Sequence, residues 1–203
     1  MSGAADMRTI TFIRHGFTAG NLSNRYVGRR TDEELSEKGI ILLQENSARD
    51  MYPQADAVFC GTMARCRQTA SILYPEQTAV PIAGLTEMDF GDFEGKNFSE
   101  LDGNPDFQAY IDSGGTTRFP GGEDRAAFID RTMAAWKKFL DAFLKTAPAE
   151  LAVSVIVNSG TLMAVASETA SPKRDYFDWH LSPGGGKKFF LMGDEKLTYI
   201  KDI

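Results

Sequence analysis

An apolar run that ends in Arg14, His15 and Gly16 constrains this chain more than any other feature. Residues Thr9 to Ile13 have the pattern of a buried strand, and a loop of small and polar residues follows it. A cation and an imidazole therefore reach the carboxyl end of a strand together, where open α/β sheets bind their ligands. A guanidinium suits phosphate oxygens, and a neutral imidazole can act as a nucleophile.

The rest of the chain alternates between helix and strand patterns. Helices are expected from the N-cap Ser36 to about Arg49, over Met63–Leu73 and Glu123–Lys145, and from about Thr161 onward. Further strands are expected at Ala57–Cys60, Val80–Ile82, Leu151–Val157, Lys187–Met192 and Leu197–Ile200, the last two joined at Gly193-Asp194. This order predicts an α/β fold, a three-layer α/β/α sandwich with a mainly parallel central sheet.

The composition excludes several classes of protein. The chain has 203 residues, enough for one domain over residues 1–203, and 42% of them are hydrophobic, as in folded globular proteins. The net charge of −6 argues against a nucleic-acid or membrane-surface binder. No apolar stretch approaches the roughly 20 residues of a membrane span. Residues 1–6 lack the pattern of a secretory signal and are expected to form a short mobile extension of a cytoplasmic protein.

Cys60 and Cys66 are the only cysteines, and no cluster of cysteine and histidine surrounds them. The sequence therefore predicts no metal site and no cofactor. Two reduced thiols are the expected state in a cytoplasmic protein.

Polar side chains follow four of the predicted strands. Arg14 and His15 follow the first, Arg65 the second, Glu87 the third and Asn158 the fourth. Because the carboxyl ends of parallel strands meet at one edge of a sheet, we expect these side chains to surround one small anion. The set suits phosphoryl transfer without a metal. The arginines would hold the phosphoryl oxygens, His15 would attack phosphorus, and Glu87 would protonate the departing alkoxide and later activate water.

Each of these residues has an alternative interpretation. His15 could be an ordinary loop histidine, and either Arg65 or Arg67 could be a surface charge of one helix. Glu87 could belong to a solvated acidic rim with three neighbours, Asp89, Asp92 and Glu94.

Two further polar residues stay open at this stage. Asn21 is either a turn residue or a further donor to phosphate from the loop after His15. His180 is too distant along the chain for its position to be predicted, and it has either a structural role or a place at the substrate rim.

Residues 91–122 break the alternation because glycine, proline and aspartate are frequent there. We expect a loop-rich cap of loops and short helices over the site, which would select the leaving group. The phenylalanines of this region, Phe90, Phe93, Phe98 and Phe107, suit either an apolar wall of the site or core packing.

Five stretches of the chain, taken together and in this order, resemble the histidine phosphatase superfamily, also called the phosphoglycerate mutase-like family. They are residues 12–21 (Phe-Ile-Arg-His-Gly-Phe-Thr-Ala-Gly-Asn), 35–39 (Leu-Ser-Glu-Lys-Gly), 65–70 (Arg-Cys-Arg-Gln-Thr-Ala), 87–95 (Glu-Met-Asp-Phe-Gly-Asp-Phe-Glu-Gly) and 121–123 (Gly-Gly-Glu). The compact length is similar to the phosphatase branch. Residues 175–180 are similar to members described as α-ribazole phosphatases.

The resemblance implies a role for each matching residue. It makes His15 the phosphoryl acceptor and Glu87 the proton donor. It makes Arg14, Asn21 and Arg65 ligands of the substrate phosphate.

The resemblance breaks at residues 157–161. Where the family has a strand followed by His-Gly-Gly, this chain has Asn158 and Ser159 in place of the histidine and the first glycine. The family's second histidine donates to the phosphate opposite the nucleophile. Asn158 can still donate a neutral hydrogen bond to it, but it cannot carry the charge of an imidazolium. Loss of one such donor typically costs on the order of 10²–10³-fold in rate.

Two functions from different classes follow. The first is a metal-independent phosphatase that hydrolyses a small phosphomonoester through a phosphohistidine, slowed by Asn158. The second is a catalytically impaired relative that binds a phosphorylated ligand as a sensor. A mutase is a third reading. In each case the expected partner is a small phosphorylated metabolite, and the sequence does not set an oligomeric state.

Overall fold

The computed structural model describes residues 8–146, 148, 150–191 and 196–203. The extension predicted over residues 1–6 and the connection predicted at Gly193-Asp194 lie outside the described residues. The strands are β1 (Thr9–Arg14), β2 (Ala57–Gly61), β3 (Val80–Ile82), β4 (Ala152–Val157), β5 (Ala170–Ser171), β6 (Gly186–Leu191) and β7 (Leu197–Asp202). The helices are α1 (Ala19–Leu22), α2 (Glu37–Ala48), α3 (Ala64–Leu73), α4 (Phe98–Leu101), α5 (Pro105–Asp112), α6 (Arg125–Thr146) and α7 (Ser159–Thr169), with 3₁₀ helices η1 (Gly91–Phe93) and η2 (Tyr176–Trp179).

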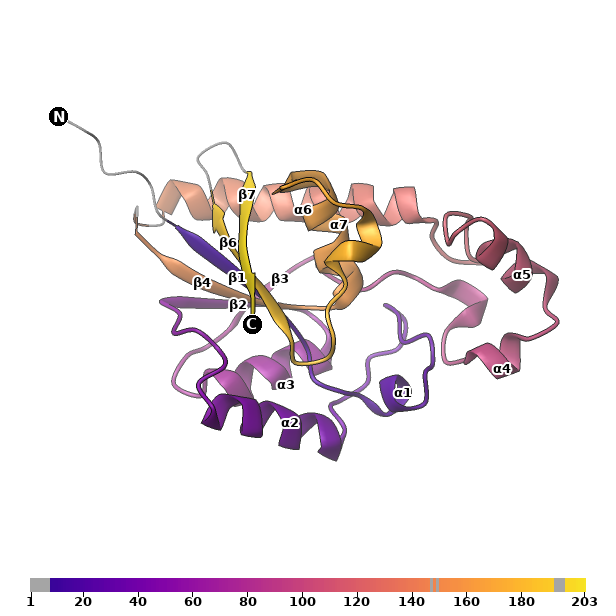
Figure 1. Cartoon of the computed structure of the whole chain (residues 1–203), viewed down its shortest axis with the longest axis horizontal. Coiled ribbons are helices and arrows are strands. Elements are labelled where there is room, and N and C mark those ends of the chain that lie inside the picture. The colour runs from indigo at the N-terminus through magenta and orange to yellow at the C-terminus, as the bar shows by residue number, and fades with distance from the viewer. Residues whose placement is uncertain (1–7, 147, 149, 192–195) are drawn as a thin grey trace.

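One mixed sheet joins the strands in the order β3-β2-β4-β1-β6-β7-β5 (Figure 1). Strands β3, β2, β4 and β1 run parallel to one another. Strand β6 is antiparallel to both β1 and β7, and β5 is parallel to β7. The predicted mainly parallel sheet of an α/β/α sandwich is confirmed, and the antiparallel pairings come from the C-terminal strands.

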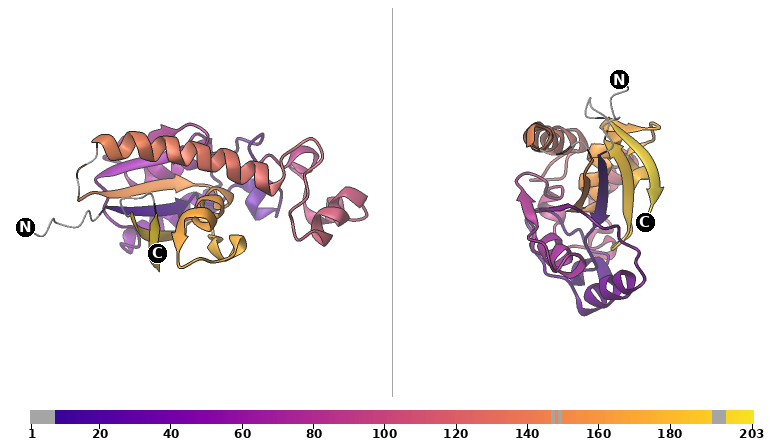
Figure 2. Two further views of the ribbon diagram at one scale, coloured as in Figure 1. Left: turned by 90° about the horizontal axis from the view of Figure 1, so that it is seen from above. Right: turned by 90° about the vertical axis from the view of Figure 1, so that its left-hand side faces the viewer.

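Helices cover both faces of this sheet because neighbouring side chains of the central strands point to opposite sides. Phe12 and Val155 are fully buried in the cluster that includes α6 and α7. The residues that follow them, Ile13 and Ile156, are fully buried against α2 and α3. The two helical layers on either side of the sheet can be followed in Figure 2.

Residues 88–128 build a third apolar cluster at one end of the molecule. Its buried members include Phe93, Phe107, Phe119 and Phe128, and Ala164 of α7 joins it. The segment predicted as loops with short helices contains η1, α4 and α5, which lie together at one end of the molecule (Figure 1). Core packing therefore explains Phe93 and Phe107, whereas the Phe98 side chain is 63% exposed.

Several predicted boundaries were wrong by one or two residues. The long helix begins at Arg125 and not at Glu123, because Asp124 Oδ1 accepts a hydrogen bond from Ala127 N (2.8 Å) in the manner of an N-cap. The helix predicted from Thr161 begins at Ser159. Short elements such as α1, β5 and η2 were missed because they are too short to show a period.

The carboxyl ends of the four parallel strands bring distant parts of the chain together. Arg14 closes β1 beside Val157, the last residue of β4. Gly61 and Ile82 close β2 and β3 side by side. This edge of the sheet carries the candidate functional residues. None of the described helices has the length and apolarity that crossing a bilayer requires.

Candidate active site

His15 follows strand β1 directly and is only 3% exposed. Its backbone N–H donates to Val157 O (3.1 Å), which fixes it against the end of β4. Its ring Nδ1 lies 2.7 Å from Gly16 O. A carbonyl oxygen only accepts, so Nδ1 carries the hydrogen, and Nε2 carries the lone pair. The local fold thus selects the tautomer whose Nε2 can act as a nucleophile.

The surroundings of His15 keep its imidazole neutral. Burial is the largest cause that lowers its pKa well below the ordinary value, and the charges of Arg65 and Arg14 lower it further. A protonated imidazole has no free lone pair, so this shift preserves the nucleophilic form.

Burial of a neutral His15 predicts a fold that loses stability in acid. Below the ordinary histidine pKa of about 6.5 the unfolded chain binds a proton here and the folded chain does not, so the free energy of unfolding falls as pH falls. This group alone is expected to contribute up to about 1.4 kcal/mol per pH unit below pH ~6. Urea unfolding of the protein and of His15→Asn, at about pH 5 and about pH 7.5, measures the difference.

His15→Asn should lose this part of the pH dependence of the free energy of unfolding. The matched control is His180→Asn. The pKa of His180 is also lowered, by burial first and then by Arg14 and Lys187, but its side chain lies at the surface. Equal pH dependence in the protein and in His15→Asn would contradict a buried neutral imidazole.

Arg65 is fully buried on helix α3 and contacts Asn158 across the sheet edge. Its Nε donates to Asn158 Oδ1 (2.8 Å), and its Nη1 donates to Thr31 O (2.8 Å). The alternative for this helix is thereby resolved, because Arg67 is the exposed arginine and donates to Thr62 O.

Asn158 is the N-cap of α7, but its side chain does not cap the helix. Its Oδ1 faces Arg65 Nε, which can only donate, so the amide nitrogen Nδ2 is the atom turned toward the site. Among the described residues this Nδ2 is buried and has no hydrogen-bond partner. A buried donor of this kind is costly to leave unpaired.

Arg14 supplies the second cation beside His15. Its Nη1 donates to Leu181 O (2.6 Å) and lies 3.4 Å from His180 Nε2. Burial lowers its pKa, while the charge of Glu87 opposes that effect. Within the described part of the chain, Arg14 Nε is also buried without a partner. Two unpaired donors, one part of the Arg14 guanidinium and one beside the Arg65 guanidinium, make this a site that favours an anion.

Glu87 lies at the N-terminus of helix α7. Its Oε2 accepts from Gly160 N (3.2 Å), and its Oε1 accepts from Met88 N (2.8 Å). A Cβ on residue 160 would lie 2.1 Å from Glu87 Oε1, so a larger residue there would displace this carboxylate from its present position. Glu87 thus gives α7 the cap that the Asn158 side chain does not provide.

Two of the three acidic neighbours of Glu87, Asp89 and Glu94, have other partners. Asp89 pairs with Arg30 (2.8 Å) and accepts from Gly91 N (2.9 Å). Glu94 accepts from Gly28 N (3.1 Å). These two carboxylates therefore hold loops together and do not form a solvated rim with Glu87.

Two cavities adjoin these residues. The first has a volume of about 370 Å³ and is lined by Arg14, Phe17, Asn21, Asn24, Arg25 and Pro183. The second, of about 190 Å³, is lined by Glu87, Gly160, Met88, Met163, Arg125 and five aromatic residues, Tyr26, Phe90, Tyr110, Tyr176 and Phe177. Tyr110 and Phe90 belong to or flank the segment 91–122, so that segment contributes a wall beside Glu87.

Asn21 lies in the short helix α1 and bonds to the residue that caps that helix. Its Oδ1 accepts from Thr18 N (3.2 Å), and Thr18 Oγ1 accepts from Asn21 N (3.2 Å), which caps the short helix α1. Asn21 thus lies within the first turn of α1, after the N-cap Thr18. It also lines the larger of the two cavities together with Arg14.

Sequence reasoning missed two residues that support the site, Glu123 and Arg131. Arg131 Nη2 donates to Glu87 O (2.7 Å), and its Nε pairs with Glu123 Oε1 (2.5 Å). The run Gly121-Gly122-Glu123 was visible in the sequence. Nothing in the sequence distinguished Arg131 from a surface charge of the long helix.

Known proteins provide an independent comparison. A family model described as the histidine phosphatase superfamily (branch 1) matches residues 10–184. A 2,3-bisphosphoglycerate-dependent phosphoglycerate mutase of Methylobacterium radiotolerans is 31% identical over 127 residues, which span 57% of this chain and 58% of that protein. A protein of the same name from Bacteroides fragilis is 27% identical over 187 residues, 73% of each chain.

Two solved structures share the fold. A candidate α-ribazole-5′-P phosphatase from Escherichia coli K-12 superposes with a TM-score of 0.81 at 20% identity, covering 96% of this chain and 95% of its own. The α-ribazole phosphatase from Shigella flexneri superposes with a TM-score of 0.79 at 20% identity, covering 95% and 94%. The matched residues include the end of β1 with His15, and also Arg65, Glu87 and Asn158. The chain therefore belongs to the histidine phosphatase superfamily.

Proposed function

We propose that this protein is a metal-independent phosphatase that hydrolyses a small phosphomonoester through a phosphohistidine at His15. Membership of the histidine phosphatase superfamily, with phosphatases and mutases among its relatives, supports a phosphatase-type activity. The observation that carries the proposal is the pair of cations, Arg14 and the buried Arg65, around a neutral imidazole. Its Nε2 bears the lone pair, beside donors on Arg14 and Asn158 that have no partner among the described residues.

The reaction has two halves. In the first, His15 Nε2 forms a bond to phosphorus, the bond from phosphorus to the leaving oxygen breaks, and protonated Glu87 gives its proton to that oxygen. Arg14, Arg65 and Asn158 hold the phosphoryl oxygens and offset the charge that develops on them. In the second, Glu87 takes a proton from water, water oxygen bonds to phosphorus, and the bond to His15 breaks.

The smaller cavity supports a leaving group that is largely apolar. It begins at Glu87, where the leaving oxygen must lie, and aromatic side chains form much of its wall. Arg125 lies over the rings of Tyr176 (5.0 Å) and Phe177 (4.7 Å). Burial, and after it the charge of Glu87, raises the pKa of Tyr176, so its hydroxyl stays a donor. This lining suits an α-ribazole phosphatase-like substrate better than a small acidic one.

The second candidate function is a catalytically impaired protein that binds a phosphorylated ligand as a sensor. The observation that favours it is Asn158, because a neutral amide stands where the family has a histidine. The two functions share the same binding site and differ in turnover.

Turnover in the presence of EDTA tests the proposal. We expect weak hydrolysis of p-nitrophenyl phosphate and of a panel of metabolite phosphates, with inorganic phosphate as a competitive inhibitor. Phosphate binding seen by calorimetry with no turnover of any ester would favour the sensor. Neither binding nor turnover would reject both functions.

Restoring a histidine at position 158 is expected to raise activity. A charge-assisted hydrogen bond to the phosphate is roughly twice as strong as the neutral one that Asn158 makes, so Asn158→His should raise kcat/KM about tenfold. The matched variant Asn158→Ala removes the donor and leaves Arg65 Nε unpaired, and it should lower kcat/KM about tenfold or more. Equal rates for the two variants would show that residue 158 does not touch the phosphate.

A further inference from the structure

We propose that Arg131, held by Glu123, is a positioning residue that fixes Glu87 at the leaving oxygen. This inference rests on the proposed function, because it assigns a role in the proton transfer from Glu87. It concerns a cluster that lies behind the site and contacts neither His15 nor Arg65 in any described hydrogen bond.

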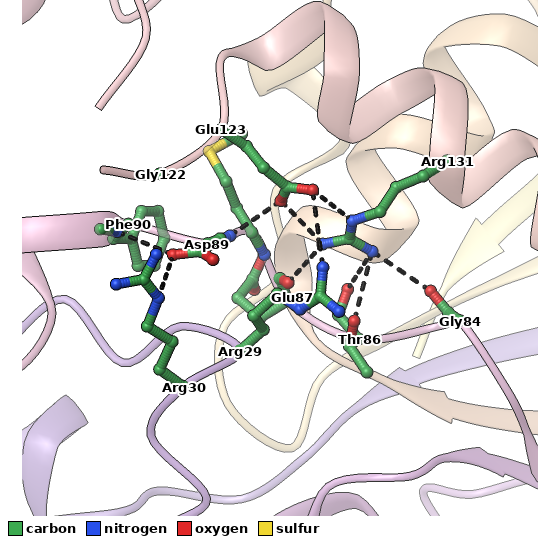
Figure 3. Close-up of polar contacts among 12 residues, drawn as sticks. Arg29, Arg30, Gly84, Thr86, Glu87, Asp89, Phe90, Gly122, Glu123 and Arg131 are labelled. Atoms are coloured by element: carbon green, nitrogen blue, oxygen red, sulfur yellow. Dashed lines mark hydrogen bonds and ion pairs between the residues drawn. The ribbon is translucent and has the colours of Figure 1, made fainter. Parts of the chain in front are cut away.

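The guanidinium of Arg131 binds the backbone on which Glu87 is carried (Figure 3). Its Nη2 donates to Glu87 O (2.7 Å). Its Nη1 lies 3.2 Å from both Gly84 O and Thr86 Oγ1. One side chain of helix α6 thus reaches three successive points of the segment that leads to the proposed acid.

This segment needs such contacts because residues 85–90 belong to no helix or strand. A backbone without a ladder has carbonyl groups that other partners must satisfy. Arginine offers five N–H donors in a planar fork, and lysine offers three from a single point. Only arginine can bridge Gly84, Thr86 and Glu87 while it also pairs with a carboxylate.

Glu123 holds Arg131 and the far side of the same segment. Its Oε1 accepts from Arg131 Nε (2.5 Å), and its Oε2 accepts from Arg131 Nη2 (2.9 Å). The same Oε2 accepts from Asp89 N (2.9 Å), and Glu123 N donates to Asp89 O (2.9 Å). Figure 3 shows the carboxylate between Arg131 and the backbone of Asp89. The pair therefore closes around Glu87 from both sides.

Different groups hold the main chain and the side chain of Glu87. Arg131 fixes the main chain, and the N–H groups of Gly160 and Met88 orient the carboxylate. If the main chain shifts, the carboxyl proton no longer reaches the leaving oxygen, while His15 and the phosphate ligands stay in place. A misplacement of about 1 Å can cost on the order of 10²-fold in rate.

Leaving-group dependence separates this role from a general structural one. p-Nitrophenolate leaves readily without a proton, whereas phenolate depends more on the acid. We expect Arg131→Lys to lower kcat/KM for phenyl phosphate about 10- to 100-fold, and for p-nitrophenyl phosphate less than about threefold. In a Glu87→Gln background, Arg131→Lys should cause no further selective loss, which a double-mutant cycle measures.

The matched control is Arg118→Lys. Arg118 also pairs with a carboxylate near the start of α6, Asp124 (2.7 Å), and donates to Gly122 O (3.0 Å), but no described contact joins it to residues 84–87. It should leave the ratio of the two kcat/KM values unchanged. If Arg131→Lys unfolds, Glu123→Gln, which weakens the same clamp, is measured instead.

Each outcome has one meaning. Equal loss on both esters, or selective loss that persists in the Glu87→Gln background, would overturn the positioning role. Absence of turnover of either ester by the unsubstituted protein would overturn the proposed function, and this inference with it.

Discussion

Replacing His15 with alanine is expected to abolish phosphoryl transfer, with kcat/KM lower by at least about 10⁴-fold. The Nε2 lone pair of His15 is the nucleophile in the proposed reaction, and His15 is the buried one of the two histidines, whereas His180 is exposed. Incubation with a ³²P-labelled ester and rapid denaturation in alkali should trap an acid-labile, alkali-stable label on the protein. His15→Ala should carry none.

The chain itself provides the control, because it contains two histidines. His180→Ala should retain the label, since His180 is exposed and its Nε2 lies 3.4 Å from Arg14 Nη1. A label that survives in His15→Ala and disappears in His180→Ala would identify His180 as the nucleophile. Turnover unchanged in His15→Ala would mean that the activity comes from another protein in the preparation.

Glu87→Gln is expected to have the second largest effect. The amide keeps the size of the carboxyl group but cannot pass a proton, so kcat/KM for phenyl phosphate should fall about 10²–10⁴-fold. The loss for p-nitrophenyl phosphate should be much smaller, because its leaving group needs little protonation. Steady-state rates with the two esters at several pH values measure the difference.

The control for Glu87 is Asp92→Asn, which removes a negative charge from the same stretch of chain. The Asp92 side chain is exposed, and it does not line the cavity beside Glu87. Its rates should equal those of the unsubstituted protein. Equal losses of kcat/KM in Asp92→Asn and Glu87→Gln would instead support the interpretation that both residues belong to a solvated acidic rim.

The central strands were predictable because a strand that is buried on both faces of the sheet is a continuous apolar run in the sequence. Thr9–Ile13 and Leu151–Val157 carry that signal, and both lie in the sheet where expected. The start of α7 was not predictable. Ser159 and Gly160 are weak helix formers, and the carboxylate that caps them comes from Glu87, 73 residues away in sequence.

The sequence predicted which candidate residues belong together, but it did not predict their hydrogen-bond partners. Arg65 and Arg67 are two residues apart on one helix, and only the tertiary fold buries the first and exposes the second. Arg131 has the pattern of a solvent-facing charge on α6. Its proposed role depends on the irregular backbone of residues 84–87. An irregular backbone has no periodic hydrophobic pattern, so the sequence did not predict these contacts.

The contact between Glu87 and Gly160 links two positions that lie 73 residues apart in the sequence. The carboxylate fills the space into which any larger residue at position 160 would extend. A larger side chain at position 160 would therefore push the Glu87 carboxylate away from the first turn of α7. In the proposed reaction, the displaced acid would no longer lie where the leaving oxygen needs its proton.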